Sequence, residues 1–253
     1  MSTSPMPWPR PEVVSIAPAY HGAFDYGELE ALALNPDEIL DFSVNSNPYG
    51  PSPQVQIAIN HTILDRYPDR EALTLRRALA VHLTTTADQI VVTNGTAEAL
   101  WLIAFACLSP GDPVLILSPT FGEYERLAAL MSANINRWEA SPVDNFAANL
   151  EAIAEKLATV QPKLAFLCNP NNPTGQVVSL QTIVDWAKTN PQTLFVIDES
   201  YLAFTTTAES TVTLTLDNII IVRSMTKDYA LAGLRLGYVV SHNQALLTAI
   251  RQS

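Results

Sequence analysis

Four polar segments of the chain carry side chains that could bind phosphate, pair with a cation or react with a carbonyl. The last segment, RSMTKDYALAGLRLG at 223–237, holds Ser224, Lys227 and Arg235 in one loop. A hydroxyl and a guanidinium can bind a phosphate, and a lysine amine can form a Schiff base with a carbonyl. A single loop lysine is more often a solvated charge, so this interpretation depends on the other three segments.

The other three segments each follow a short apolar run. TNGTAEAL (93–100) joins a glycine turn to a helical pattern, which suits an anion site but is also typical of an ordinary capped turn. CNPNNPTG (168–175) holds two Asn-Pro steps that force an extended loop, and a structural turn would not explain its clustered amides. VIDESY (196–201) ends an apolar run on a carboxylate, which is costly to bury without a positive partner and is common where exposed.

Alternating helical and strand patterns from Asp69 onward would position these segments. Residues 69–83 have apolar residues at helical spacing, and Asp69 is the expected N-cap. Short apolar runs predict the strands, and helical patterns separate several of them. The expected strands are 89–93, 113–117, 135–139, 163–168, 193–198, 218–223 and 236–240, and the other expected helices are 96–108, 121–131, 149–159 and 179–189.

Apolar strands that alternate with helices predict an α/β fold. The expected architecture is a mostly parallel, doubly wound sheet of about seven strands, covered by helices on both faces. In such a sheet the binding loops lie at the carboxyl ends of the strands. The polar segments fall at these ends, so we expect them to meet at one site.

The composition of the chain excludes several classes of protein. Its 253 residues are 48% hydrophobic, which is enough for a sizeable core, and its net charge of −11 would repel nucleic acid and anionic membranes. No apolar window is long enough to span a membrane, and the N-terminus lacks the continuous apolar core of a secretory signal. The four prolines in the first eleven residues argue against a helix there. Cys107 and Cys168 lie in apolar stretches, which favours reduced, buried thiols over a disulfide or a metal site. The sequence thus predicts a soluble, cytoplasmic protein without a metal.

The succession of motifs resembles the class I and II aminotransferases, a fold type I group of pyridoxal-phosphate enzymes. NPNNPTG, DE-x-Y, and S-x-x-K followed eight residues later by an arginine occur in the family's order across roughly 90–240. The resemblance implies that Lys227 holds the coenzyme as a Schiff base and that Asp198 pairs with its ring nitrogen. It also implies that Asn172 and Tyr201 bond to the phenolic oxygen and that Phe121 stacks on the ring. Lys227, Asp198 and Tyr201 are the expected catalytic residues.

The resemblance also implies a phosphate site and a second subunit. Tyr67 resembles a tyrosine that reaches the coenzyme phosphate of the neighbouring subunit, which predicts a homodimer. The implied phosphate site consists of Gly95, Thr96, Ala97, Ser224 and Arg235.

The N-terminal third narrows the resemblance. HGAFDYGELEALALNPDEILDFSVNSNPYGPSP (21–53) is similar to the start of the L-threonine-O-3-phosphate decarboxylases of cobalamin synthesis, and its NPYGPSP also resembles histidinol-phosphate aminotransferases. Both relatives act on a phosphorylated amine, so His21 and Asn47 are candidate substrate contacts. Decarboxylation of threonine phosphate is the expected reaction, with transamination of histidinol phosphate as the alternative.

The resemblance finally predicts how the chain is divided. Residues 1–68 would form an N-terminal arm that contacts substrate, 69–240 the coenzyme-binding large domain, and 241–253 the start of a connecting helix. Family members continue into a small C-terminal domain with an arginine for the substrate carboxylate, and no residue here matches it. Two other interpretations stay open: a coenzyme-binding protein with little catalysis, and a nucleotide-binding α/β domain, although no G-x-G-x-x-G follows a strand.

Overall fold

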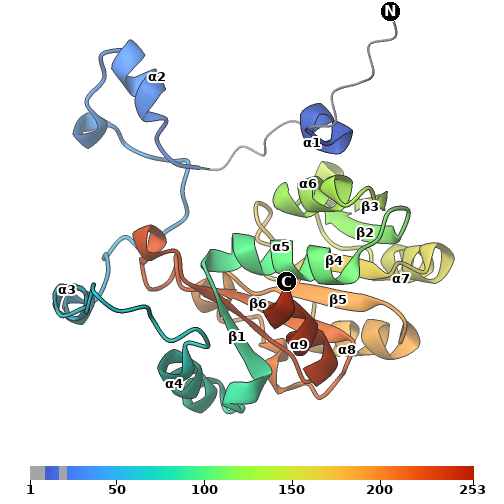
Figure 1. Ribbon diagram of the computed structural model, residues 1–253. Coiled ribbons are helices and arrows are strands. Elements are labelled where there is room, and N and C mark those ends of the chain that lie inside the picture. The colour runs from blue at the N-terminus through green and yellow to red at the C-terminus, as the bar shows by residue number, and fades with distance from the viewer. Residues whose placement is uncertain (1–8, 17–21) are drawn as a thin grey trace, which may run out of the picture.

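A seven-stranded sheet in the order β1-β7-β6-β5-β4-β2-β3 forms the centre of the molecule (Figure 1). The computed structural model describes residues 9–16 and 22–253. Strand β7 runs antiparallel to both of its neighbours, β1 and β6, and the other neighbouring strands are parallel. The strands are β1 (Ile90–Thr93), β2 (Pro113–Ser118), β3 (Asn134–Glu139), β4 (Leu164–Cys168), β5 (Leu194–Asp198), β6 (Ile219–Ser224) and β7 (Gly237–Val240).

Polar caps fix the starts of several helices around this sheet. The side chains of Asn149, Ser179 and Asn243 accept hydrogen bonds from backbone N–H groups in the first turns of α7, α8 and α9. Among the described residues no helix is long and apolar enough to cross a membrane. The α-helices are α1 (Pro11–Ser15), α2 (Tyr26–Ala31), α3 (Pro53–Asn60), α4 (Leu73–Leu83), α5 (Gly95–Cys107), α6 (Glu123–Leu130), α7 (Leu150–Val160), α8 (Leu180–Thr189) and α9 (Gln244–Gln252). The 3-10 helices are η1 (Pro36–Glu38), η2 (Ala87–Gln89), η3 (Pro142–Asp144), η4 (Leu202–Phe204), η5 (Thr211–Thr213) and η6 (Ala232–Leu234).

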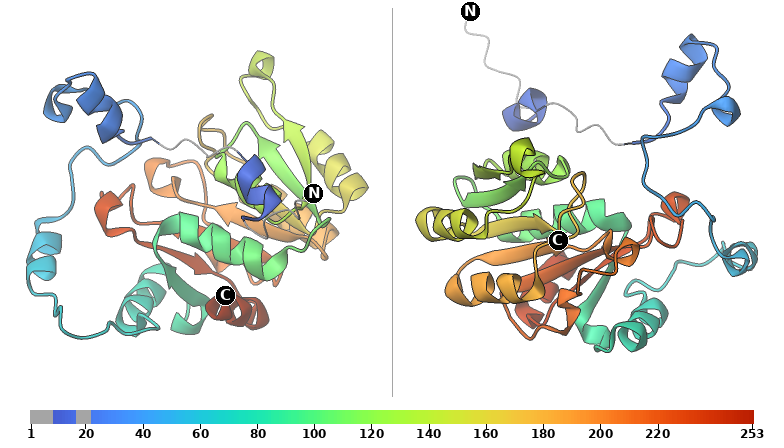
Figure 2. Two further views of the ribbon diagram at one scale, coloured as in Figure 1. Left: turned by 45° about the horizontal axis from the view of Figure 1, so that its top comes forward. Right: turned by 180° about the vertical axis from the view of Figure 1, so that it is seen from behind.

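The two faces of the sheet bury separate apolar clusters. Val114, Ile116 and Val196 point to the face covered by α5, α6 and α9. Leu115 and Ile197, their neighbours along the same strands, point to the face covered by α4, α7 and α8. Figure 2 shows helices on both sides of the sheet. The predicted α/β fold with a mostly parallel, seven-stranded sheet is therefore confirmed.

Two local expectations about helices differ from the structure. Helix α4 begins at Leu73, because Ala72 adopts a left-handed backbone, and Asp69 accepts hydrogen bonds from the N–H groups of Leu73 (2.7 Å) and Glu71 (3.0 Å). The expectation that the proline-rich start excludes a helix is wrong at α1. This five-residue helix begins at Pro11. A proline is tolerated at the first position of a helix, because the N–H group of that residue has no hydrogen-bond partner within the helix. The division of the chain at 68 and 240 stays a prediction.

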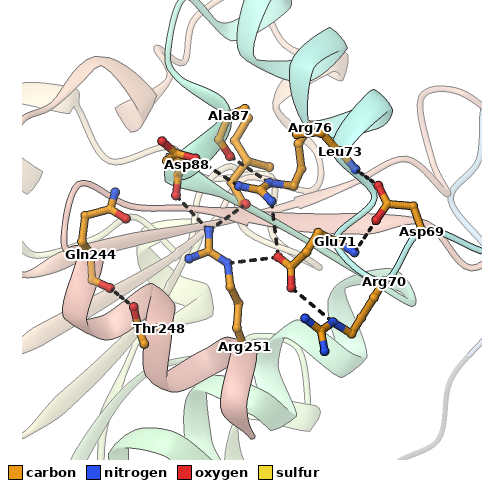
Figure 3. A network of polar contacts seen from close by, with 11 residues as sticks. Asp69, Arg70, Glu71, Leu73, Arg76, Ala87, Asp88, Gln244, Thr248 and Arg251 are labelled. Carbon is orange, nitrogen blue, oxygen red and sulfur yellow. Dashed lines mark hydrogen bonds and ion pairs between the residues drawn. The ribbon is translucent and has the colours of Figure 1, made fainter.

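A network of charged groups ties the last helix to the edge of the sheet (Figure 3). Arg251 of α9 donates to the carbonyl oxygen of Asp88 (2.9 Å), and its Nε lies 3.8 Å from Glu71 Oε2. Arg76 of α4 reaches the same carboxylate oxygen at 3.3 Å and donates to the carbonyl oxygen of Ala87 at 2.9 Å. Because Arg76 is buried, its guanidinium needs these partners. These contacts hold Arg251 beside β1, which indicates a structural role for this residue.

Candidate active site

One cavity of about 330 Å³ gathers side chains from all four polar segments. It lies where the segments after β1, β4, β5 and β6 meet, and residues 43–45 of the N-terminal segment close part of it. The predicted site residues that line it are Thr96, Ala97, Phe121, Asn172, Asp198, Tyr201, Lys227 and Arg235.

Lys227 projects from the β6–β7 loop as a half-buried amine. Its Nζ lies 5.9 Å from the centre of the Tyr201 ring. Burial, together with the charge of Arg235, lowers the pKa of Lys227, while Asp198 opposes this shift. A lowered pKa increases the share of neutral amine, which is the nucleophilic form. The site therefore suits covalent chemistry with a carbonyl.

Asp198 ends β5 as a buried carboxylate surrounded by donors. Its Oδ1 accepts from the N–H (2.9 Å) and the hydroxyl (2.5 Å) of Ser200, and its Oδ2 accepts from the Tyr124 hydroxyl at 2.8 Å. Burial raises the pKa of Asp198, and these hydrogen bonds act in the opposite direction. A cationic group in the cavity would be well placed to pair with this carboxylate.

Asn172 and Tyr201 lie side by side in the lining of the cavity. The side-chain amide of Asn172 lies 3.5 Å from the Tyr201 hydroxyl. Burial raises the pKa of Tyr201, and a hydrogen bond with Asn45 partly offsets this. Phe121 stands edge-to-face against Tyr124, with ring centres 5.6 Å apart. These side chains bring polar donors and an aromatic ring to one cavity, a combination that suits a flat, polar ring.

Two glycines let the Arg235 loop lie against the start of α5. Gly95 has φ +79°, and a Cβ there would lie 2.8 Å from Arg235 Nη2. A Cβ on Gly237 would lie 2.6 Å from the carbonyl carbon of Gly95 and 2.8 Å from the Thr96 nitrogen. The first N–H groups of the 13-residue helix α5 and a guanidinium therefore share one end of the cavity. This arrangement favours an anion.

Ser224 lies beside this end but does not line the cavity. Its hydroxyl is hydrogen-bonded to that of Thr226 at 2.6 Å, and Thr226 is the residue that faces the cavity. Gly95 is likewise absent from the lining, because Arg235 covers it.

The candidate residues of the N-terminal segment differ in their positions relative to the cavity. His21 lies outside the described residues. Asn47 does not line the cavity: its N–H donates to the carbonyl oxygen of Lys227 (3.0 Å) and its side-chain amide to that of Asp228 (2.9 Å). Asn45 lines the cavity instead. Tyr67 is fully exposed and lies apart from the lining. Its role at a second subunit, like the substrate roles of His21 and Asn47, stays a prediction.

Eight lining residues were not anticipated as site residues: Gly22, Ser43, Val44, Asn45, Tyr124, Cys168, Ser200 and Thr226. Tyr124 belongs to the segment SPTFGEY, and Ser200 and Thr226 stand next to predicted site residues. Their closeness in sequence to a motif was therefore the available signal for these residues, but that closeness does not show which side chains point into the cavity.

The two cysteines have different environments. Cys168 is buried and lines the cavity, and burial raises the pKa of its thiol to about 12. Cys107 is partly buried, and burial raises its pKa to about 11. Both are free thiols. Across residues 9–16 and 22–253, no cluster of side chains is suited to hold a metal ion.

Comparison with known proteins identifies the family. The sequence pattern described as "Aminotransferase class I and II" matches residues 37–253. The histidinol-phosphate aminotransferase of Moorella thermoacetica is 36% identical over 217 residues, which cover 82% of this chain and 55% of that protein. The threonine-phosphate decarboxylase of Salmonella typhimurium is 36% identical over 239 residues, which cover 92% and 64%.

The fold is also that of solved family members. The histidinol-phosphate aminotransferase of Sinorhizobium meliloti, solved in complex with pyridoxal-5'-phosphate, gives a TM-score of 0.81 at 23% identity, over 99% of this chain and 72% of that one. At that identity the likeness concerns the fold. The chain spans 55% and 64% of the lengths of the two curated relatives named above. From the match over 37–253, the chain belongs to the class I and II aminotransferase family.

Proposed function

We propose that the protein is a pyridoxal-phosphate-dependent enzyme that acts on a phosphorylated amine. The observation that carries this proposal is the convergence of Lys227, Asp198 and Tyr201 with the start of α5 on one cavity. The solved relative that holds pyridoxal-5'-phosphate has the same fold, which supports the choice of coenzyme.

The residues of the cavity fit this coenzyme. A phosphate group matches the cradle formed by Arg235 and the first turn of α5, which Gly95 and Gly237 allow to lie close together. The buried carboxylate of Asp198 matches a protonated ring nitrogen, and Tyr201 with Asn172 matches a phenolic oxygen. When bound, the coenzyme supplies an electron sink for the bond that breaks at the substrate's α carbon.

Each protein group then has a defined task. Lys227 would hold the coenzyme through its aldehyde carbon, and its amine is placed to move a proton at the substrate's α carbon. Asp198 would keep the ring nitrogen protonated, and Tyr201 would orient the phenolic side of the ring. Phe121 lines the cavity and would stack on the ring. Which bond breaks depends on where the substrate carboxylate is held.

Two reactions are candidates. Decarboxylation of threonine phosphate is supported by the Salmonella relative, whose match covers 92% of the chain, against 82% for the Moorella aminotransferase. Transamination of histidinol phosphate is supported by its being the commoner name among the curated relatives. Release of carbon dioxide and formation of keto product should be measured side by side on both substrates. Carbon dioxide from threonine phosphate supports the first candidate, and keto product from histidinol phosphate alone supports the second.

We further propose a cytoplasmic homodimer. Tyr49, before α3, and Leu64 and Tyr67, after it, are each more than nine-tenths exposed, and a second copy would cover such apolar side chains. Analytical ultracentrifugation tests this, and a monomer at micromolar concentration would contradict it.

Borohydride reduction tests the coenzyme assignment. Wild-type protein incubated with pyridoxal phosphate should yield a mass adduct on Lys227 after reduction. Lys227→Ala should give none, and Lys188→Ala, which removes an exposed lysine, should behave like wild type. An adduct of equal yield on another lysine in the Lys227→Ala protein would show that the assignment is wrong.

A further inference from the structure

Tyr124 reaches Asp198 from a different part of the fold. It lies on α6, has no exposed surface, and stacks flat on Phe166 of β4, with ring centres 4.9 Å apart and an interplanar angle of 8°. This packing holds the ring in place, so its hydroxyl is directed at Asp198 Oδ2 at 2.8 Å. Neither the motif DE-x-Y nor the proposed function assigns a role to this tyrosine.

Ser200 forms hydrogen bonds with the other oxygen of the same carboxylate. Its N–H and its hydroxyl both donate to Asp198 Oδ1. One oxygen is thus held by the local turn after β5, and the other by a tyrosine 74 residues earlier in the chain. Two anchors on opposite oxygens fix the plane of the carboxylate as well as its position.

All three donors favour the charged carboxylate. A buried carboxylate without donors would take up a proton, since burial penalises its charge. Burial raises the pKa of Tyr124 well above its usual value, and Asp198 raises it further, so the phenol stays protonated and donates. A hydrogen bond from a neutral hydroxyl to a carboxylate stabilises the ionised state.

The other titratable groups around Asp198 come from three places. Glu199, next in the chain, would favour protonation of Asp198, but it forms a buried ion pair with Arg223 at 2.8 Å. Cys168 of β4 is a neutral thiol, because burial raises its pKa to about 12. Tyr201 and Lys227 face Asp198 across the cavity.

We propose that Tyr124 and Ser200 are positioning residues that keep Asp198 ionised and fix the direction in which it faces the cavity. The consequence rests on the proposed function: a fixed anion at this place holds the proton on the coenzyme's ring nitrogen. Tyr124 and Ser200 act through Asp198, and their effect is therefore measurable without coenzyme.

The first test follows the Asp198 carboxyl in coenzyme-free protein. Its ¹³C resonance is identified by its loss in Asp198→Asn and is then titrated with pH in wild type, Tyr124→Phe and Ser200→Ala. Loss of one hydrogen bond to a charged group should raise the titration midpoint by about one to two pH units in each variant. Tyr238→Phe, which alters another buried tyrosine, should leave the midpoint unchanged.

Wild-type midpoints in both Tyr124→Phe and Ser200→Ala would overturn the proposal. If Tyr124→Phe does not fold, Ser200→Ala decides alone, because Ser200 donates from a loop outside the helices and strands. A merely structural role for these residues would change stability but would not move the carboxyl titration.

The second test uses pyridoxal phosphate and its analogue with carbon in place of the ring nitrogen. In Tyr124→Phe, affinity for pyridoxal phosphate should fall at the acidic end of the pH range, while affinity for the analogue stays at the wild-type value. Equal losses for both compounds would contradict the proposal. If neither compound binds even to wild type, the proposed function fails, whereas the carboxyl titration still decides the role of Tyr124 and Ser200.

Discussion

Replacing Gly237 by alanine tests how closely the sheet must approach the phosphate end of the cavity. The new Cβ would lie 2.6 Å from the Gly95 carbonyl carbon and 2.8 Å from the Thr96 nitrogen. Both are backbone atoms in the first turn of α5, so no side-chain rotation can relieve the overlap. Strand and helix must move apart by about 0.8 Å to restore an ordinary contact of 3.4 Å.

Overpacking of this kind costs about 1–3 kcal/mol, so the free energy of unfolding should fall by that amount. The same movement displaces the N–H groups that we propose for the coenzyme phosphate. Affinity for pyridoxal phosphate should therefore fall more than affinity for pyridoxal, which lacks the phosphate. Urea unfolding and calorimetric titration with the two compounds measure these effects.

Gly122→Ala is the matched control for this experiment. Gly122 has a helical backbone (φ −63°, ψ −19°), and a Cβ there meets nothing within 4 Å. It should unfold like wild type or slightly later. A Gly237→Ala protein with wild-type stability and wild-type affinity would refute the steric argument and, with it, the importance of this close approach.

Three further variants or measurements have defined outcomes. Asp198→Asn should reduce turnover about a hundredfold while the phosphate cradle retains coenzyme, and equal losses in turnover and binding would indicate a structural role. Burial and Arg235 lower the pKa of Lys227, so its amine should react with trinitrobenzenesulfonate at lower pH in wild type than in Arg235→Met. Peptide mass spectrometry can check this. Asn47→Ala removes the hydrogen bond to the Asp228 carbonyl oxygen and should lower the free energy of unfolding by about 0.5–1.5 kcal/mol. It should also slow covalent capture of the coenzyme, measured by stopped-flow absorbance. Unchanged capture would mean that this hydrogen bond does not hold the Lys227 loop.

Most of the strands could be read from the sequence because they are short, continuous apolar runs, whereas β3 (Asn134–Glu139) is a partly exposed edge strand with polar residues. The expected run 113–117 became β2 (Pro113–Ser118), and 193–198 became β5 (Leu194–Asp198). Burial on both faces makes such strands apolar throughout, so their signal does not depend on distant contacts. The start of α4 was less predictable, since Asp69 caps its first turn across a left-handed Ala72 that no spacing rule reveals.

The site residues were predictable where they belong to a motif. They were less predictable where membership of the site depends on the direction in which a side chain points. Lys227 and Asp198 line the cavity as expected. Asn45 and Asn47 stand two positions apart in a segment without regular structure, and only the bonds to the Lys227 loop show which one turns away. Tyr124 is a tyrosine in an amphipathic helix, and its contact with Asp198 depends on how α6 sits over the sheet.

Because β1 lies at the edge of the sheet, its position affects when it can pair while the protein is being synthesised. Strands β2 to β6 find their partners among segments that are synthesised close together, but among the described residues β1 pairs with β7 alone. At about 5–20 residues per second, roughly 7–30 s separate the emergence of β1 from that of β7. During this interval the apolar residues of β1 and α5 lack their sheet partner. The first strand to leave the ribosome is thus among the last to be paired, and chaperone protection of this segment should raise the yield of folded protein.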